Sequence, residues 1–275
     1  MHNLPPITAS EAPQRLRVLT LNLHTWQEER QQEKFRTIAD AIRELEIDIA
    51  CFQEVGELWN DGRGDPATHA GRIIRGHLGE GWHLFSDWSH VGFDRYREGV
   101  AILSRFPFKE TGAAWLSSER SPWSIHARKA VRARILLPGD TLDVVSTHFS
   151  WPENGFFDQF RTMETWLDAR ADLPTLGTLV CGDFNVEVSS PAFARLARET
   201  PWREQFMKAT APETFRAVFE EGRPPPPGDS RIDYLWLSPG NALVATAGAK
   251  LFTPERYGPV SDHPGYAVEF ALPSP

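Results

Sequence analysis

The sequence predicts an α/β fold built from two similar halves. Residues 15–55 and residues 141–185 each read as a buried strand, an amphipathic helix and a second buried strand. This order of elements is the signature of an α/β sheet. In both halves the strands end in polar side chains, and open α/β sheets commonly build their sites at strand ends.

The first half opens with RLRVLTLNLH, residues 15–24, an apolar run that predicts a strand with Asn22 near its end. Residues 28–46 carry apolar side chains three and four positions apart, which predicts a helix. The run IDIACFQEV, residues 47–55, predicts the second strand, which ends at Glu54.

The second half repeats this order. Residues 141–151 predict a strand that carries His148 near its end, and residues 156–172 predict a helix with one apolar face. The closing strand, LGTLVCGDFN, ends with Asp183 and Asn185. Side chains two apart on an extended chain face the same way, so we expect these two to project together.

Other apolar runs predict the remaining strands. They cover residues 81–88, 98–108, 130–138 and 231–240, and residues 261–270 contain a turn followed by the last strand. Asp233 lies near the start of one of them, and Asp262 and His263 lie in a turn before the last. Residues 220–230 include four consecutive prolines, which neither a helix nor a central strand accepts, and we interpret them as a loop within the domain.

Composition narrows the class of protein. No apolar run approaches the roughly 20 residues that span a bilayer, and the N-terminus lacks the basic start and apolar stretch of a secretory signal. Cys51 and Cys181 lie in apolar runs, so we interpret them as buried hydrophobic residues rather than disulfide partners or zinc ligands. We therefore expect a cytoplasmic protein, and a monomer.

The charge balance bears on possible partners. The chain has 29 Lys and Arg against 37 Asp and Glu, a net charge of −8. This balance is unfavourable for gripping long nucleic acid through its phosphates, although it does not exclude a local basic cleft.

The polar groups at strand ends and turns form an oxygen-rich set. Its members are Asn22, Glu54, His148, Asp183, Asn185, Asp233, Asp262 and His263. Carboxylates and amides suit Mg²⁺ or Mn²⁺, whereas zinc favours cysteine and clustered histidine. A hard cation, an acid–base group and charged donors are what phosphate-ester hydrolysis requires.

Seven short motifs carry a family resemblance. They are LNLH, FQEV, EGVAILSRFPF, STHFSW, GDFN, RIDYLWLS and SDHPGY, and they run from residue 21 to residue 266. In this order they resemble the endonuclease/exonuclease/phosphatase superfamily of metal-dependent phosphoesterases. The resemblance implies a four-layer α/β/β/α sandwich whose site lies where the loops of two sheets meet. It also implies a single catalytic domain over residues 15–275, preceded by an N-terminal tail, residues 1–14.

The resemblance assigns metal ligands. Glu54 corresponds to the main ligand of Mg²⁺ or Mn²⁺, and Asn22 and Asp262 correspond to residues that support it directly or through water. Pro264 follows His263 directly, where the family more often inserts a residue before proline.

It also assigns catalytic roles. Asp183 would orient or deprotonate the attacking water, and Asn185 would hold the phosphate or the water. His263 would contact a phosphate oxygen, oriented by Asp233 at its other ring nitrogen. His148 would stabilise the transition state or protonate the leaving oxygen. Taken alone, Asp233 could instead form a surface ion pair with Arg231.

The motif STHFSW indicates a branch. The apurinic-site repair enzymes carry a tyrosine there, whereas a Thr-His pair is similar to the sphingomyelinase, inositol-phosphatase, deadenylase and tyrosyl-DNA phosphodiesterase branches. We therefore expect hydrolysis of a phosphodiester, such as a lipid head group or a small molecule. The alternatives are a nuclease acting on DNA or RNA ends, which the net charge disfavours, a phosphomonoesterase, and a catalytically silent scaffold, which predicts a broken site.

Two features near these motifs stay open. Arg128 and Lys129 are basic neighbours, and strand alternation allows only one of them to point into the site. Trp88, Trp115, Trp123 and Trp151 border it, where tryptophan could stack on a base, enter a membrane interface or simply pack.

Overall fold

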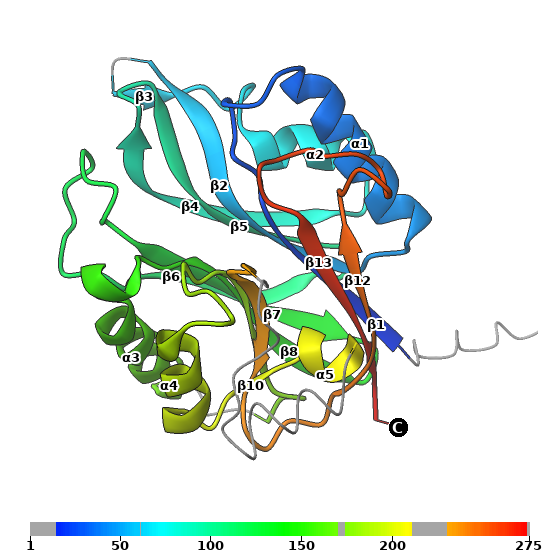
Figure 1. Cartoon of the computed structure of the whole chain (residues 1–275). Helices are drawn as coiled ribbons and strands as arrows, with labels where there is room; N and C mark the ends of the chain where they lie inside the picture. The colour runs from blue at the N-terminus through cyan, green and yellow to red at the C-terminus, as the bar shows by residue number, and fades with distance from the viewer. Residues whose placement is uncertain (1–14, 61, 170–173, 211–229, 274–275) are drawn as a thin grey trace, which may run out of the picture.

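The computed structural model describes residues 15–60, 62–169, 174–210 and 230–273. Two β-sheets pack face to face, and helices cover their outer faces (Figure 1). The expected tail, residues 1–14, and nearly all of the proline-rich loop lie outside the described residues.

The first sheet contains the first half of the chain and its C-terminal strands. Its strands are β1 (Arg15–Asn22), β2 (Ile49–Asn60), β3 (Arg63–Gly64), β4 (His83–Gly92), β5 (Tyr96–Ser104), β12 (Val244–Leu251) and β13 (Gly265–Ala271). They follow the order β12-β13-β1-β2-β5-β4, with β3 paired to β2. β1 and β2 are parallel, with α1 (Gln31–Glu44) between them in the chain, while the other pairs are antiparallel.

The second sheet repeats this arrangement. Its strands are β6 (Phe108–Trp115), β7 (Lys129–Leu137), β8 (Asp140–His148), β9 (Thr178–Asp183), β10 (Arg203–Glu204) and β11 (Asp233–Leu237), in the order β10-β11-β9-β8-β7-β6. β8 and β9 are its parallel pair, separated in the chain by a 3₁₀ turn (Pro152–Asn154) and α3 (Phe156–Asp168). Both predicted strand–helix–strand units are therefore confirmed.

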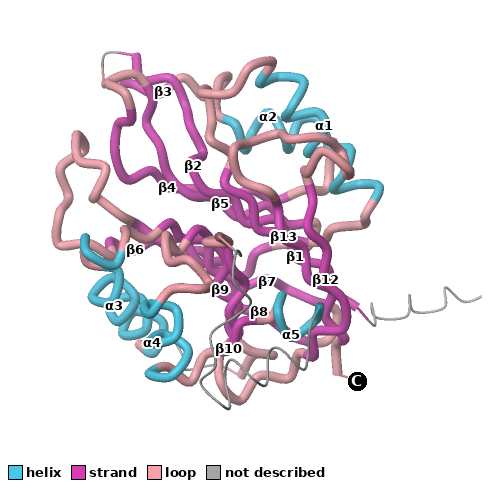
Figure 2. The backbone as a smooth tube through the Cα atoms, viewed as in Figure 1, coloured by secondary structure: helices cyan, strands magenta, loops and turns pink. Residues whose placement is uncertain are grey.

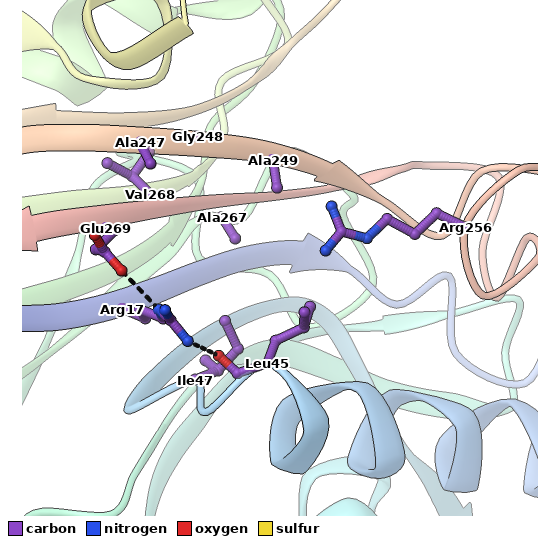
Figure 3. A pocket seen from close by; sticks show the side chains of 10 residues that line it. All are labelled: Arg17, Leu45, Ile47, Ala247, Gly248, Ala249, Arg256, Ala267, Val268 and Glu269. Atoms are coloured by element: carbon purple, nitrogen blue, oxygen red, sulfur yellow. Dashed lines mark hydrogen bonds and ion pairs between the residues drawn. The ribbon is translucent and has the colours of Figure 1, made fainter.

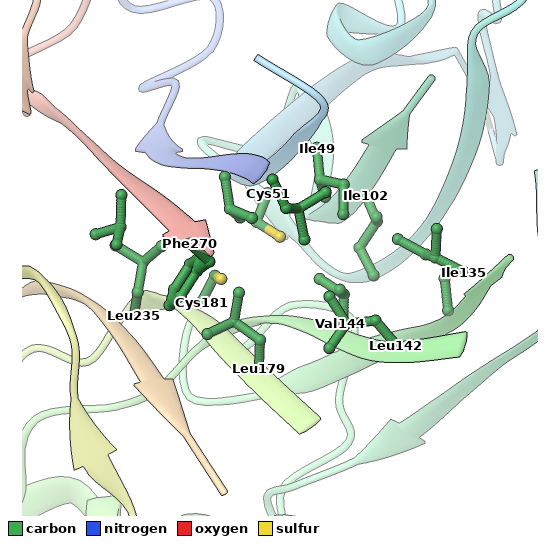
Figure 4. Close-up of a cluster of buried hydrophobic side chains, with 14 of the residues drawn as sticks. Ile49, Cys51, Ile102, Ile135, Leu142, Val144, Leu179, Cys181, Leu235 and Phe270 are labelled. Carbon is green, nitrogen blue, oxygen red and sulfur yellow. The ribbon is translucent and has the colours of Figure 1, made fainter. Parts of the chain in front are cut away.

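Three hydrophobic cores separate four layers. Between the sheets, Cys51 and Ile102 of the first sheet pack with Val144 and Cys181 of the second (Figure 4). A second core lies between the first sheet and α1, and a third lies between the second sheet and α3. Figure 2 shows α1 outside the first sheet and α3 outside the second, which is the predicted α/β/β/α order. Both cysteines are free and buried, as expected.

The structure adds short helices that periodicity did not reveal. They are α2 (Ala70–Leu78), α4 (Pro191–Glu199) and α5 (Phe206–Thr210). The side chain of Ser190 caps α4 by accepting the backbone N–H of Phe193, and Pro191 occupies its first turn. Serine followed by proline is a helix-start signal, so this helix was recognisable from sequence. None of the described helices is long and apolar enough to cross a membrane.

Several predicted boundaries were wrong. β2 does not end at residue 55 but continues to Asn60. The register of its pairing with β5 shifts between Phe52 and Val55, where a bulge adds a residue to β2, and the pairing then continues. The run 98–108 contains most of β5 and the first residue of β6, with a turn between them. The helix expected over 28–46 is shorter at both ends, spanning Gln31–Glu44.

Gly182 is required where β9 passes β8. A Cβ atom at this position would lie 1.9 Å from the carbonyl oxygen of Thr147, which belongs to the neighbouring strand. The parallel pairing that carries Asp183 to the sheet edge therefore depends on the missing side chain.

Replacing Gly182 with alanine should lower the free energy of unfolding by at least about 2 kcal/mol, because the backbone of β8 must move. Urea unfolding measures this loss. Gly112→Ala in β6 is the matched control, because the nearest atom to its added Cβ lies 3.9 Å away. Equal stability of the two variants would contradict this reading of the β8–β9 contact.

Candidate active site

The ends of β1, β8 and β9 and the bulge of β2 meet at one edge of the two sheets. Asn22 joins them: its Nδ2 donates to Glu54 Oε1 at 2.8 Å and to Asp183 Oδ2 at 3.1 Å. Its Oδ1 accepts the backbone N–H of His24 at 3.0 Å, which fixes the amide. Carboxylates from both halves of the chain are thus held around one side-chain amide.

The bulge in β2 directs Glu54 toward this edge. Glu54 has a φ of 48°, a left-handed conformation that is uncommon outside glycine. Bulges often re-aim a side chain beside a site. Burial raises the pKa of Glu54 to about 7, and the charges of Glu98 and Asp183 add to the shift.

Asp183 and Asn185 converge, although not by strand alternation. β9 ends at Asp183, and Asn185 has a φ of 51°. The backbone N–H of Asn185 donates to Asp183 Oδ1 at 2.8 Å, so a side-chain-capped turn, not an extended chain, brings the pair together. The Asn185 amide then donates to the carbonyl oxygen of Phe149 at 2.9 Å.

Asp183 is the buried centre of the cluster. Burial raises its pKa to about 7 and the charge of Asp233 adds to this, while His263 and the hydrogen bonds from Asn185 and Asn22 oppose it. Its Oδ2 lies 3.5 Å from His148 Nε2 and 3.9 Å from His263 Nε2. Both histidines therefore face the same carboxylate.

The two histidines differ in charge. Burial holds the pKa of His148 well below its usual value, with a contribution from Arg128, so this imidazole is neutral. Its Nε2 lies 3.1 Å from the amide nitrogen of Asn185. Burial also acts to lower the pKa of His263, but the hydrogen bond and charge of Asp233 outweigh it and raise the pKa to about 10.

Asp233 pairs with His263 rather than with Arg231. Its Oδ2 lies 2.8 Å from His263 Nδ1, which leaves Nε2 facing Asp183. Arg231 instead bonds Glu204 at 3.0 Å, and both Asp233 and Arg231 are buried.

Asp262 lies at the rim. Its side chain is 55% exposed, and its Oδ1 lies 3.5 Å from His24 Nδ1, which in turn lies 2.7 Å from Glu28 Oε1. The sequence motifs assigned no site role to His24 or to Glu28. Their spacing of four residues was the available signal.

The described residues include three groups of acidic and histidine side chains. Within each group, the oxygen and nitrogen atoms that could bind a metal ion lie within 4.8 Å of one another. The groups are Glu54, His148 and Asp183; Asp183, Asp233 and His263; and His24, Glu28 and Asp262. Burial raises the pKa values of Glu54 and Asp183, and repulsion by the neighbouring carboxylates adds to the shift. Oxygen donors of this kind fit a hard divalent cation such as Mg²⁺ or Mn²⁺.

A separate pocket of about 210 Å³ lies elsewhere, between β12, β13 and the end of α1 (Figure 3). It sits toward the opposite ends of β1 and β13 from Asn22 and His263. Its charged residues include Arg17 and Glu269, which pair at 2.9 Å. This pocket has no part in the cluster described above.

The hydrogen bonds from Asn22 to Glu54 and Asp183 can be tested by replacing the amide with a carboxylate. Asn22→Asp keeps the bond to the His24 N–H but turns the donor facing Glu54 and Asp183 into a third carboxylate. In EDTA we expect a loss of about 2 kcal/mol in unfolding free energy, measured by urea unfolding, and partial recovery on adding Mg²⁺.

Asn241→Asp is the matched control. Asn241 also accepts a backbone N–H two residues on, from Leu243, but its amide donates to the carbonyl oxygen of Ser238. A similar loss in both variants, or no response of Asn22→Asp to Mg²⁺, would contradict the proposed role of Asn22 between two carboxylates.

Comparisons with known proteins agree with this architecture. The structure of an endonuclease/exonuclease/phosphatase family protein from Leptotrichia buccalis aligns with a TM-score of 0.76 at 22% identity, covering 92% of this chain and 98% of that one. The catalytic domain of human nocturnin aligns with a TM-score of 0.71 at 18% identity, covering 96% of each chain. A mannosyl-6-phosphatase from Bacteroides thetaiotaomicron aligns with a TM-score of 0.67 at 16% identity, covering 94% of this chain and all of that one.

At such identities these structures establish the fold alone. A search of curated proteins gives no significant match. The model of the Endonuclease/Exonuclease/phosphatase family, however, matches residues 26–263. The chain therefore belongs to the Endonuclease/Exonuclease/phosphatase family, as its motifs predicted.

Proposed function

We propose that this chain is a divalent-metal-dependent phosphodiester hydrolase. Members of its family are phosphoesterases. The observation that carries the proposal is the junction at Asn22, where carboxylates from both sheets meet beside one neutral and one charged histidine.

Glu54 is the main metal ligand in this proposal. Its half-buried carboxylate is held by Asn22 and repelled by Glu98 and Asp183, so a cation would stabilise it. A bound Mg²⁺ or Mn²⁺ would act as a Lewis acid on a phosphoryl oxygen. Asn22 would support that ion by holding the Glu54 carboxylate with its N–H, because its own oxygen accepts the His24 N–H, and Asp262 would support it from the exposed rim, directly or through water.

Asp183 orients the attacking water and accepts its proton. Its carboxylate is fixed by bonds from Asn22 and from the Asn185 backbone, so an acceptor is positioned before substrate arrives. The Asn185 amide donates one N–H to the Phe149 carbonyl oxygen, and the other, which faces His148 Nε2 in this structure, would turn to hold the water or the phosphate.

The histidines take different roles because their charges differ. Asp233 holds His263 as an imidazolium, which donates a charged hydrogen bond from Nε2 to a phosphate oxygen. His148 is neutral, which favours stabilising the transition state by hydrogen bonding over protonating the leaving oxygen.

Hydrolysis of bis-p-nitrophenyl phosphate and p-nitrophenyl phosphate, with Mg²⁺, Mn²⁺ or EDTA, tests the proposal. We expect diester cleavage that EDTA abolishes. Glu54→Gln should need at least about tenfold more metal for half-maximal rate, because the amide is a weaker ligand. Glu46→Gln, at an exposed position paired with Arg15, is the matched control and should behave as wild type.

Cleavage of the monoester alone would replace the proposal with a phosphatase. No cleavage of either ester with any metal would contradict it.

A further inference from the structure

Arg128 is a buried cation to which the described part of the chain offers no hydrogen-bond acceptor or ion-pair partner. The residue directly precedes β7 and is 4% exposed. Its backbone is anchored, because its N–H donates to Ser117 Oγ at 2.8 Å and its carbonyl oxygen accepts the Leu116 N–H at 2.9 Å. Among the described residues, none forms a hydrogen bond or ion pair with its guanidinium, and its Nε is fully buried.

Other buried arginines of this chain are paired. Arg134 makes two bonds to Asp143, at 2.9 and 2.8 Å, and Arg132 bonds Glu110 at 3.2 Å. Arg231 bonds Glu204 at 3.0 Å. A buried charge left without a partner is costly, so the structure retains Arg128 against its own stability.

Arg128 lies beside the carboxylate–histidine cluster, because Ala130 pairs with Thr147 across β7 and β8 and the residue before β7 therefore lies next to the His148 end of β8. The charges of Glu98, Asp183 and Glu54 act on the guanidinium, and its own charge is among those that lower the pKa of the buried His148. Its Cζ lies 6.0 Å from the centre of the Trp151 ring, which is partly exposed. The free donors of Arg128 are thus placed where the reacting group of a substrate would enter.

The neighbouring Lys129 differs. Its Nζ bonds Asp87 Oδ2 at 2.7 Å and lies 4.4 Å from the centre of the Trp115 ring. Its charge is therefore already neutralised by the protein. Of the two adjacent basic residues, Arg128 is the one whose charge is left for a ligand.

We infer that Arg128 binds the non-bridging oxygens of the substrate's phosphoryl group. The inference rests on the proposed function and adds a binding residue to it. Guanidinium is planar and matches the oxygens of phosphate with parallel N–H groups, which an ammonium does not. The phosphate supplies the counter-charge that Arg128 lacks in the protein alone.

Calorimetry of inorganic phosphate in saturating Mg²⁺ tests this directly. Arg128→Gln should weaken phosphate binding at least about tenfold, as expected for loss of charge-assisted hydrogen bonds, and Arg128→Lys should restore part of it. Lys129→Gln removes the same charge one residue away and should change the dissociation constant by less than about threefold.

Thermal unfolding separates this role from a structural one. Because the guanidinium has no partner to lose, Arg128→Gln should melt within a few degrees of wild type or above it. A clearly lowered Tm together with unchanged phosphate affinity would overturn the inference.

The inference and the proposed function can also fail separately. Normal phosphate binding by Arg128→Gln, in a protein whose wild type cleaves diesters, overturns the inference and leaves the function. Phosphate binding that is lost in Arg128→Gln, in a wild type that cleaves no ester, supports the anion site and removes the function.

Discussion

The site depends on the side-chain amide of Asn22, which donates to carboxylates from both sheets. Glu54 Oε1 and Asp183 Oδ2 lie 2.8 and 3.1 Å from the same nitrogen. Without this donor, two closely spaced carboxylates would face each other with only repulsion between them. Glu54 belongs to the first sheet and Asp183 to the second, so the packing of the two sheets on their shared core also sets the distance between these carboxylates.

The chain reaches this geometry through backbone conformations that are otherwise unfavourable. Glu54 and Asn185 both have positive φ, of 48° and 51°, and Gly182 allows a strand contact that no side chain would permit. Such conformations persist where the surrounding structure enforces them, and they concentrate at functional sites. Arg128 is a second unfavourable feature, because no described residue forms a hydrogen bond or ion pair with its buried guanidinium, and the inferred phosphate would supply that partner.

Much of this was predictable from sequence because it is local. Apolar periodicity revealed both strand–helix–strand halves, and polar residues at the expected strand ends indicated Asn22, Glu54 and Asp183 as site candidates, although Glu54 lies at a bulge within β2. The bulge at Glu54, the turn that brings Asn185 back to Asp183 and the exposed position of Asp262 depend on pairing between distant segments. The unpaired state of Arg128 is likewise invisible in sequence, since it is defined by which carboxylates other elements bring near.

The most direct measurement is the turnover of Asp183→Asn with bis-p-nitrophenyl phosphate and saturating Mg²⁺, beside its unfolding curve. The substitution keeps the shape of the side chain and removes the charge at the centre of the cluster. We expect a kcat at least about 100-fold below wild type in a protein that folds normally, because Asp183 no longer accepts the proton of the attacking water. A folded variant with a near-normal kcat would contradict the proposed role of Asp183, because the reaction would then proceed without its carboxylate.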